Sequence, residues 1–163
     1  MKLAFALLLA LAPLALAVET QNGLQVSVAP KTISRNDARY ASYFTDRALN
    51  RMMALQIIAK NVSTKAMNEG TVEWQILVLS TSGGSTLYSG RERLSALKTA
   101  ASAELLVGSA QITGWRDASY QRKDKLEYKI IVNHGGAVTA TIVSTPAFES
   151  LSLHAARVQP PGE

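Results

Sequence analysis

The stretch LEYKIIVNHGGAVTATIV, residues 126–143, decides the fold. Apolar and polar side chains alternate on both sides of its glycine pair, which predicts two half-buried strands joined by a tight turn. A two-residue loop would set Val132 against Thr139 and mix the two faces. We therefore expect a three-residue loop, His134–Gly136, that pairs core positions with core positions. His134 would then lie at the hairpin tip in water and not in a reactive site.

The same alternation recurs along most of the chain, between short runs of turn residues. The stretches concerned are 24–28, 53–59, 72–78, the residues from 87 onward, 103–112, 126–132 and 138–142. Strands in this number, with no long helical pattern between them, predict an all-β, immunoglobulin-like antiparallel β-sandwich of about seven strands. We expect its interior to contain Leu55, Ile57, Trp74, Ile76, Tyr128 and Ile130.

The N-terminal residues 1–17, MKLAFALLLALAPLALA, have a charged start, an apolar run and a small-residue ending at Ala17. This layout is typical of a secretory signal peptide, and an uncleaved N-terminal anchor is the alternative. The apolar run is shorter than the roughly 20 residues of a transmembrane helix. We therefore expect an exported protein with no membrane span after cleavage.

The rest of the chain is long enough for one domain. Removal of 17 of the 163 residues leaves 146, which one hydrophobic core can support. We expect the sandwich over 18–146 and a C-terminal tail over 147–163. The absence of cysteine excludes disulfides and favours the bacterial periplasm, the outer membrane or the cell surface.

No motif for catalysis or cofactor binding is present. The sequence lacks a G-x-S-x-G elbow, a P-loop and a G-x-G-x-x-G run, and it has only two histidines for a metal. We therefore predict a protein that is not an enzyme and has no cofactor or metal site. The net charge of +5 is mild and its basic residues are scattered, so we do not expect nucleic-acid binding.

One set of apolar residues falls on strand positions that should face water. A two-residue turn at Gly83-Gly84 would put them on the outer face of one sheet, if the strands are neighbours. The predicted contact patch is Leu77, Leu79, Tyr88, Ile131 and Val143. Either the tail covers this patch, through Phe148, Leu151 and Val158, or another molecule does.

Two longer segments interrupt the strand pattern. Residues 31–51 combine polar and aromatic side chains, and they either connect strands along a sheet edge or form a ligand loop. Residues 114–125 form a second long loop, whose aromatic and basic side chains either fold onto the core or bind a sugar or an acidic partner. The possible ligand residues in this loop are Trp115, Arg116, Tyr120 and Arg122.

Several short runs resemble exported bacterial immunoglobulin-like modules. They are NVSTKAMNEGT (61–71) before a strand that carries Trp74, LSALKTAASAEL (94–105), and LEYKIIV (126–132). The last places Tyr128 at the position of a tyrosine corner, with Ile130 where an immunoglobulin cysteine would stand. The whole chain resembles small exported immunoglobulin-like proteins encoded beside type IV pilus-like genes in verrucomicrobial gut bacteria. That resemblance implies a role in pilus or cell-surface assembly.

We therefore expect a non-enzymatic exported protein that acts by contact with a protein partner or with its own copies, in pilus or cell-surface assembly or adhesion. The alternative is a glycan-binding module that uses the loop 114–125.

Overall fold

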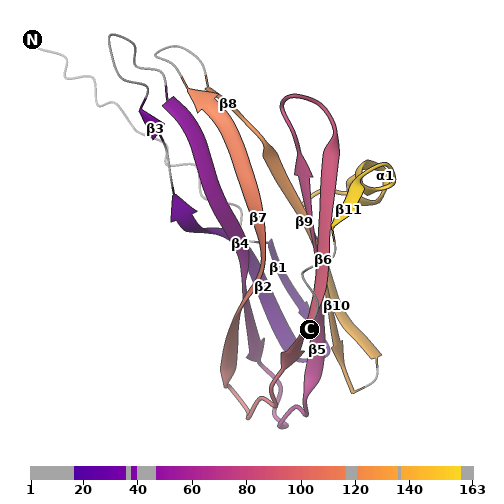
Figure 1. Ribbon diagram of the computed structural model, residues 1–163. Coiled ribbons are helices and arrows are strands. Elements are labelled where there is room, and N and C mark those ends of the chain that lie inside the picture. The colour runs from indigo at the N-terminus through magenta and orange to yellow at the C-terminus, as the bar shows by residue number, and fades with distance from the viewer. Residues whose placement is uncertain (1–16, 36–37, 40–46, 117–120, 136, 159–163) are drawn as a thin grey trace, which may run out of the picture.

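The structure, a computed structural model, describes residues 17–35, 38–39, 47–116, 121–135 and 137–158. In this part of the chain, strands form two sheets that pack face to face, and one short helix lies outside them (Figure 1). The predicted all-β sandwich is confirmed. Residues 1–16 of the predicted signal peptide lie outside the described residues, and the first strand starts at Ala17.

The six-stranded sheet has the order β1-β2-β4-β7-β8, and β3 also pairs with β4. Its strands are β1 (Ala17–Gln21), β2 (Leu24–Arg35), β3 (Ala38–Arg39), β4 (Arg47–Asn61), β7 (Ser102–Arg116) and β8 (Gln121–Lys123). The five-stranded sheet has the order β10-β9-β5-β6-β11. Its strands are β5 (Gly70–Leu79), β6 (Ser85–Leu94), β9 (Lys125–His134), β10 (Ala137–Val143) and β11 (Ala156–Val158).

The long strands follow an immunoglobulin-like order. β2, β4 and β7 correspond to strands A, B and E, and they face β5, β9 and β10, which correspond to C, F and G. β6 extends the second sheet as an added C′ strand does in variable-type domains. The short strands β1, β3, β8 and β11 are additions at the sheet margins that the sequence pattern did not predict.

The core lies between the sheets and consists of the inward positions of the long strands. All six residues expected in the interior belong to this one cluster, so Trp74 and Tyr128 lie on the same side of their sheet. Val26 and Val28 of β2 and Val107 of β7 complete it from the opposite sheet. Burial of each such side chain contributes about 1.5–3 kcal/mol, so this cluster is the main source of stability.

Trp74 fits between the sheets because two neighbouring residues have no side chain. A Cβ on Gly90 of β6 would lie 2.4 Å from the indole, and one on Gly108 of β7 would lie 2.9 Å from it. Gly108 also has φ +64°, a conformation that other residues rarely adopt, and it lies at an irregularity in the β4–β7 pairing. The two glycines therefore make room for the largest side chain of the core.

The β9–β10 hairpin differs from the predicted three-residue loop. His134 pairs with Ala137, so the loop has two residues, and the exposed Val138 pairs with Asn133. A β-bulge between Val138 and Ala140 then shifts the register, and Ala140 pairs with Val132. The bulge restores the core face after a turn that would otherwise have mixed the faces.

We predicted that His134 lies in water at the hairpin tip, but the structure shows otherwise. It is half-buried in β9, opposite Gly70 of β5, and its Nε2 atom is buried with no hydrogen-bond partner among the described residues. The turn itself is consistent with the sequence, because Gly135 adopts φ +61°.

The β5–β6 hairpin also differs from the predicted two-residue turn at Gly83-Gly84. Its loop has five residues, Ser80 to Gly84, because Leu79 pairs with Ser85. An odd loop length exchanges the two faces of β6 relative to a two-residue loop. Tyr88 consequently packs against the core opposite Ile76, and Leu87 takes the outer position opposite Leu77.

Tyr128 occupies the expected position in β9 but does not form a tyrosine corner. Its hydroxyl donates to the carbonyl oxygen of Val28 in the opposite sheet, at 3.4 Å, instead of to the backbone a few residues upstream. Burial and the charge of Glu127 raise the pKa of Tyr128. Ile130 is fully buried, and apolar packing stands where an immunoglobulin domain has its disulfide.

The tail consists of one short helix and one short strand. It forms α1 (Phe148–Ser152) and then β11, which pairs in parallel with β6. Among the described residues, no helix has the length and apolar character needed to cross a membrane.

Candidate contact surfaces

The outer face of the five-stranded sheet is covered by the tail. Phe148 of α1 is only 1% exposed and packs with Leu77 and Leu87, and Leu79 and Leu151 lie around them. Of the three tail residues expected to form this cover, Phe148 and Leu151 do so, whereas Val158 is exposed in β11. The covering role therefore belongs to α1, and β11 occupies the free edge of β6.

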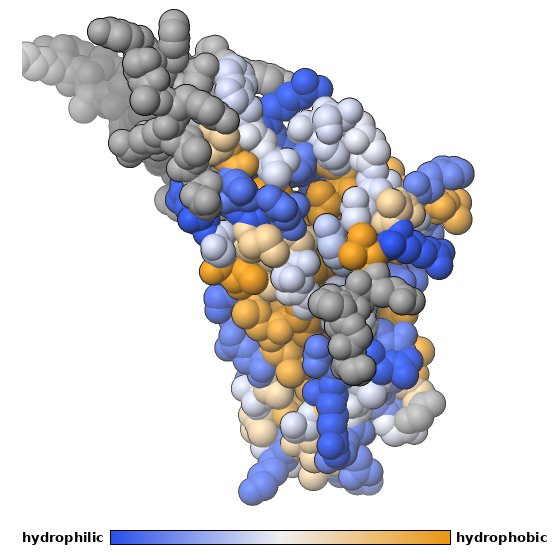
Figure 2. Space-filling view, in the orientation of Figure 1, coloured by the Kyte–Doolittle hydropathy of each residue, from blue (hydrophilic) through white to orange (hydrophobic). Residues whose placement is uncertain are grey.

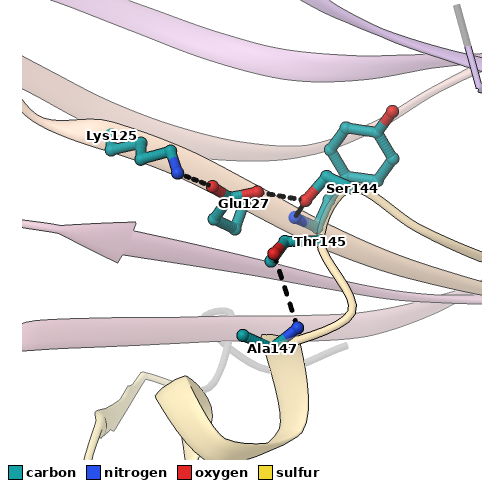
Figure 3. Close-up of polar contacts among 6 residues, drawn as sticks. Lys125, Glu127, Ser144, Thr145 and Ala147 are labelled. Carbon is teal, nitrogen blue, oxygen red and sulfur yellow. Dashed lines mark hydrogen bonds and ion pairs between the residues drawn. The ribbon is translucent and has the colours of Figure 1, made fainter.

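Polar contacts hold the start of the tail against the sheet (Figure 3). Glu127 of β9 is almost fully buried, and it accepts hydrogen bonds from Ser144 Oγ at 2.5 Å and from Lys125 Nζ at 2.6 Å. Ser144 Oγ in turn accepts a hydrogen bond from the backbone N–H of Tyr128 at 2.8 Å. An ion pair between Lys129 and Glu149 joins the sheet to α1 directly.

The five residues of the predicted contact patch therefore do not form one exposed surface. Leu77 and Leu79 lie beneath the tail, and Tyr88 belongs to the core, so its placement on the outer face was wrong. Ile131 is half-buried opposite Glu73 and Thr141, and Val143 is exposed opposite Lys129. Of the five residues, only Val143 is exposed.

The two segments that interrupted the strand pattern meet at one end of the six-stranded sheet. Instead of a loop over 114–125, β7 continues to Arg116 and pairs with β8; β4 starts at Arg47 and pairs with both β7 and β3. The segment 31–51 is also strand where the structure describes it, because it contains the end of β2, all of β3 and the start of β4. Tyr120 lies outside the described residues.

The register places basic residues side by side at this end. Arg39, Arg47 and Arg116 occupy one cross-strand row over β3, β4 and β7. The neighbouring row contains Ala48, Trp115 and Arg122, and Trp115 is 39% exposed. Arg116 and Trp115 are successive residues of one strand, so they belong to opposite faces of the sheet, and the predicted ligand residues do not form a single cluster.

We call this region the cationic end; its described residues are 35, 38–39, 47–51, 113–116 and 121–125, which belong to the sequence segments 35–51 and 113–125. These two segments contain eight of the 17 Lys and Arg residues but four of the 12 Asp and Glu residues. Their net charge of +4 nearly equals the +5 of the whole chain. Figure 1 shows the two sheets diverging toward this end, and Figure 2 shows both hydrophilic and apolar surface where it borders the grey region. The basic character of the protein is therefore local.

A cleft of about 310 Å³ opens between the sheets where they diverge. The inward positions of β4 change there from apolar Leu55 and Met53 to Arg51, and Leu49 follows in the same alternation. The cleft is lined by Pro30, Thr32, Leu49, Arg51, Met53, Ile112, Lys123, Asp124, Lys125 and Leu126. Its floor is mainly apolar and its rim mainly basic.

Asp124 is the acidic residue of this lining, and its carboxylate is satisfied within the protein. It accepts hydrogen bonds from the backbone N–H groups of Thr81 and Thr113, at 3.0 and 2.8 Å, and from both threonine hydroxyls. Burial alone would raise the pKa of Asp124, but these four hydrogen bonds outweigh it and lower the pKa. Asp124 thus links the β5–β6 loop to β7, and its lowered pKa keeps it ionised.

A larger hollow, of about 630 Å³, lies on β5, β6 and β9 away from the cationic end. Glu69 forms an ion pair with Arg93 in this hollow, and Glu73 forms one with Arg91 beside it. These charges neutralise one another at the surface, so the hollow has no excess of either sign to attract a ligand. In the part of the chain that is described, no group of His, Cys, Asp and Glu side chains is arranged to hold a metal ion.

Comparisons with known proteins do not assign a family. No family model matches the sequence, and no curated protein matches it either. A crystal structure of a protein from Akkermansia muciniphila is 10% identical over 88% of this chain and 84% of its own, with a TM-score of 0.37. An X-ray structure of a structural-genomics target is 12% identical over 77% of this chain and 89% of its own, also with a TM-score of 0.37.

The first of these structures comes from a verrucomicrobial gut bacterium, the group that the sequence resemblance named. Likenesses of this strength carry no argument about function, and a pilus association of this chain is not shown by them.

Proposed function

We propose that this protein is an exported, non-enzymatic, immunoglobulin-like sandwich that binds another protein in pilus or cell-surface assembly or adhesion. The cationic end is the surface that makes this contact. One observation carries the proposal: the register brings together two basic segments that are far apart in the sequence, with Arg39, Arg47 and Arg116 at paired positions of β3, β4 and β7.

The physical reason is electrostatic. A local net charge of +4 raises the rate of encounter with an acidic surface. An acidic partner would therefore be attracted to this end.

The outer face of the five-stranded sheet is the weaker candidate for the contact. Its apolar centre is already buried by Phe148, and β11 pairs with the edge of β6 at residues Thr86 to Tyr88. A partner at that face would first have to displace the tail.

The proposal is tested by capturing proteins from a native envelope extract on the purified protein. The double variant Arg47→Glu/Arg116→Glu reverses two charges of the row, and Lys60→Glu/Arg157→Glu makes the same change at exposed positions elsewhere. We expect the first variant to lose a partner that the wild type and the control retain, and we expect that binding to weaken as salt is raised. Equal capture of the same protein by all three would contradict the proposal.

A second candidate, glycan binding, is favoured by the exposed Trp115 directly opposite Arg122. A sugar ring could stack on the indole while the guanidinium binds its oxygen atoms. The substitution Trp115→Ala should then abolish binding on a glycan array and leave the unfolding midpoint nearly unchanged. The absence of wild-type binding to any glycan would exclude this candidate.

A further inference from the structure

The cleft between the diverging sheets combines features that the proposed contact does not require. Met53, Ile112 and Leu126 give it apolar walls, although it opens onto the most basic part of the surface. At about 310 Å³ it lies at the lower limit of ligand pockets, which run from roughly 300 to 1,000 Å³. Its size suits one bulky side chain better than a cofactor.

The charged residues at the rim indicate the chemistry of the partner segment that would carry this side chain. Lys123 is exposed and has no ion-pair partner among the described residues, whereas Lys125 is paired with Glu127 at 2.6 Å. Asp124 is committed to Thr81 and Thr113, so it does not compete for the rim cations.

We propose that this cleft receives one bulky apolar side chain from an acidic segment of a partner protein, whose carboxylates pair with Lys123 at the rim. This inference rests on the proposed function and specifies the partner's chemistry. The apolar anchor supplies affinity by leaving water, and the flanking carboxylates fix its position.

The experiment uses synthetic acidic peptides that differ at one central residue, Phe or Ala, and an otherwise identical Phe peptide in which Gln and Asn replace Glu and Asp. Binding to the full-length secreted protein is measured by fluorescence anisotropy at low salt. We expect the acidic Phe peptide to bind at least tenfold more tightly than the acidic Ala peptide, and the uncharged Phe peptide to bind weakly.

Two protein variants distinguish the contribution of the cleft to peptide binding from the contribution of the charge. Thr32→Trp places a large side chain at an exposed lining position, and it should abolish the difference between the Phe and Ala peptides. Lys123→Glu should weaken both acidic peptides, whereas Lys60→Glu, an exposed lysine at the other end of β4, should weaken neither. Unfolding midpoints confirm that each variant is folded.

The outcomes distinguish this inference from the proposed function. If both acidic peptides bind equally well and in a salt-dependent way, the cleft is not the anchor site, although the cationic end still binds acidic partners. If no acidic peptide binds while decanoate does, the cleft takes a lipid anion and the inference is overturned. If Arg47→Glu/Arg116→Glu also captures the wild-type set of envelope proteins, the proposed function fails as well.

Discussion

The tail-covered face and the cationic end are two different kinds of outer surface on the same sandwich. The covered face holds Leu77 and Leu87, and the chain closes it with its own Phe148. The cationic end holds a row of arginines over three strands and a cleft that is open to solvent. Burial of apolar surface by the same chain lowers the free energy of the folded state. Charged surface is already solvated by water and is available to a partner. The first region should therefore matter for stability and the second for binding.

The largest expected effect is at the centre of the covered face. The substitution Phe148→Ala should lower the free energy of unfolding by about 3–5 kcal/mol, because it leaves a cavity over Leu77 and Leu87. The matched control is Leu153→Ala, since Leu153 is 74% exposed, and its effect should stay within about 0.5 kcal/mol. Urea denaturation measures both, and similar losses for the two variants would contradict the covering role of α1.

Deletion of residues 147–163 tests the same role at the surface. It exposes the apolar centre of the five-stranded sheet, so the truncated protein should self-associate in light scattering while the full chain does not. A truncated protein that remains monomeric and as stable as the full chain would show that the tail is dispensable there.

Asp124 should have the next largest effect, because it lies where the covered sandwich meets the cationic end. The substitution Asp124→Asn removes the charge that accepts hydrogen bonds from Thr81 and Thr113, and we expect a loss of about 1.5–3 kcal/mol in urea. Lys123→Asn alters a neighbouring exposed residue and serves as the control.

The pH dependence of stability provides an independent check on Asp124. Since folding lowers its pKa, its contribution is fully present above the unfolded value of about 3.9 and is lost as the pH falls through the folded value. The stability difference between wild type and Asp124→Asn should therefore shrink from pH 6 toward pH 2. A difference that stays constant over this range would indicate that the charge of Asp124 is not responsible.

The smallest expected effect is a gain in stability at the cationic end. Arg116→Glu places opposite charges across β4 and β7 and should raise the free energy of unfolding by roughly 0.2–1 kcal/mol, while it weakens binding to acidic peptides. A substitution that improves folding and impairs binding would identify the arginine row as functional. A loss of stability with unchanged binding would instead assign the row a structural role.

The strands and the core were predictable because alternation is a local signal. Positions such as Trp74, Ile76 and Ile130 each follow a polar neighbour within one stretch, and all of them are buried between the sheets. The faces of β6 were not predictable, because the five-residue loop before it exchanges inside and outside. In β10 the turn was shorter than predicted, but a bulge next to Thr139 returned Ala140 and Ile142 to the core.

The candidate surfaces depended still more on long-range contacts. The sequence predicted Trp115, Arg116 and Arg122 as possible ligand residues, but not that Arg47 would lie opposite Arg116. These two residues are far apart in the chain, and only the pairing of the 15-residue strands β4 and β7 brings them together. The cleft was likewise not predictable, since its walls come from both sheets and exist only because the sheets diverge.

The sequence by itself determined that this chain forms a layered β structure, because a repeated period-two pattern gives each strand one apolar face that must pack against another layer. The tertiary structure decided which residues meet across strands, whether the tail covers the apolar face, and where the positive charge collects. Register depends on the length of each turn and on single bulges, and neither changes the local pattern from which strands are predicted.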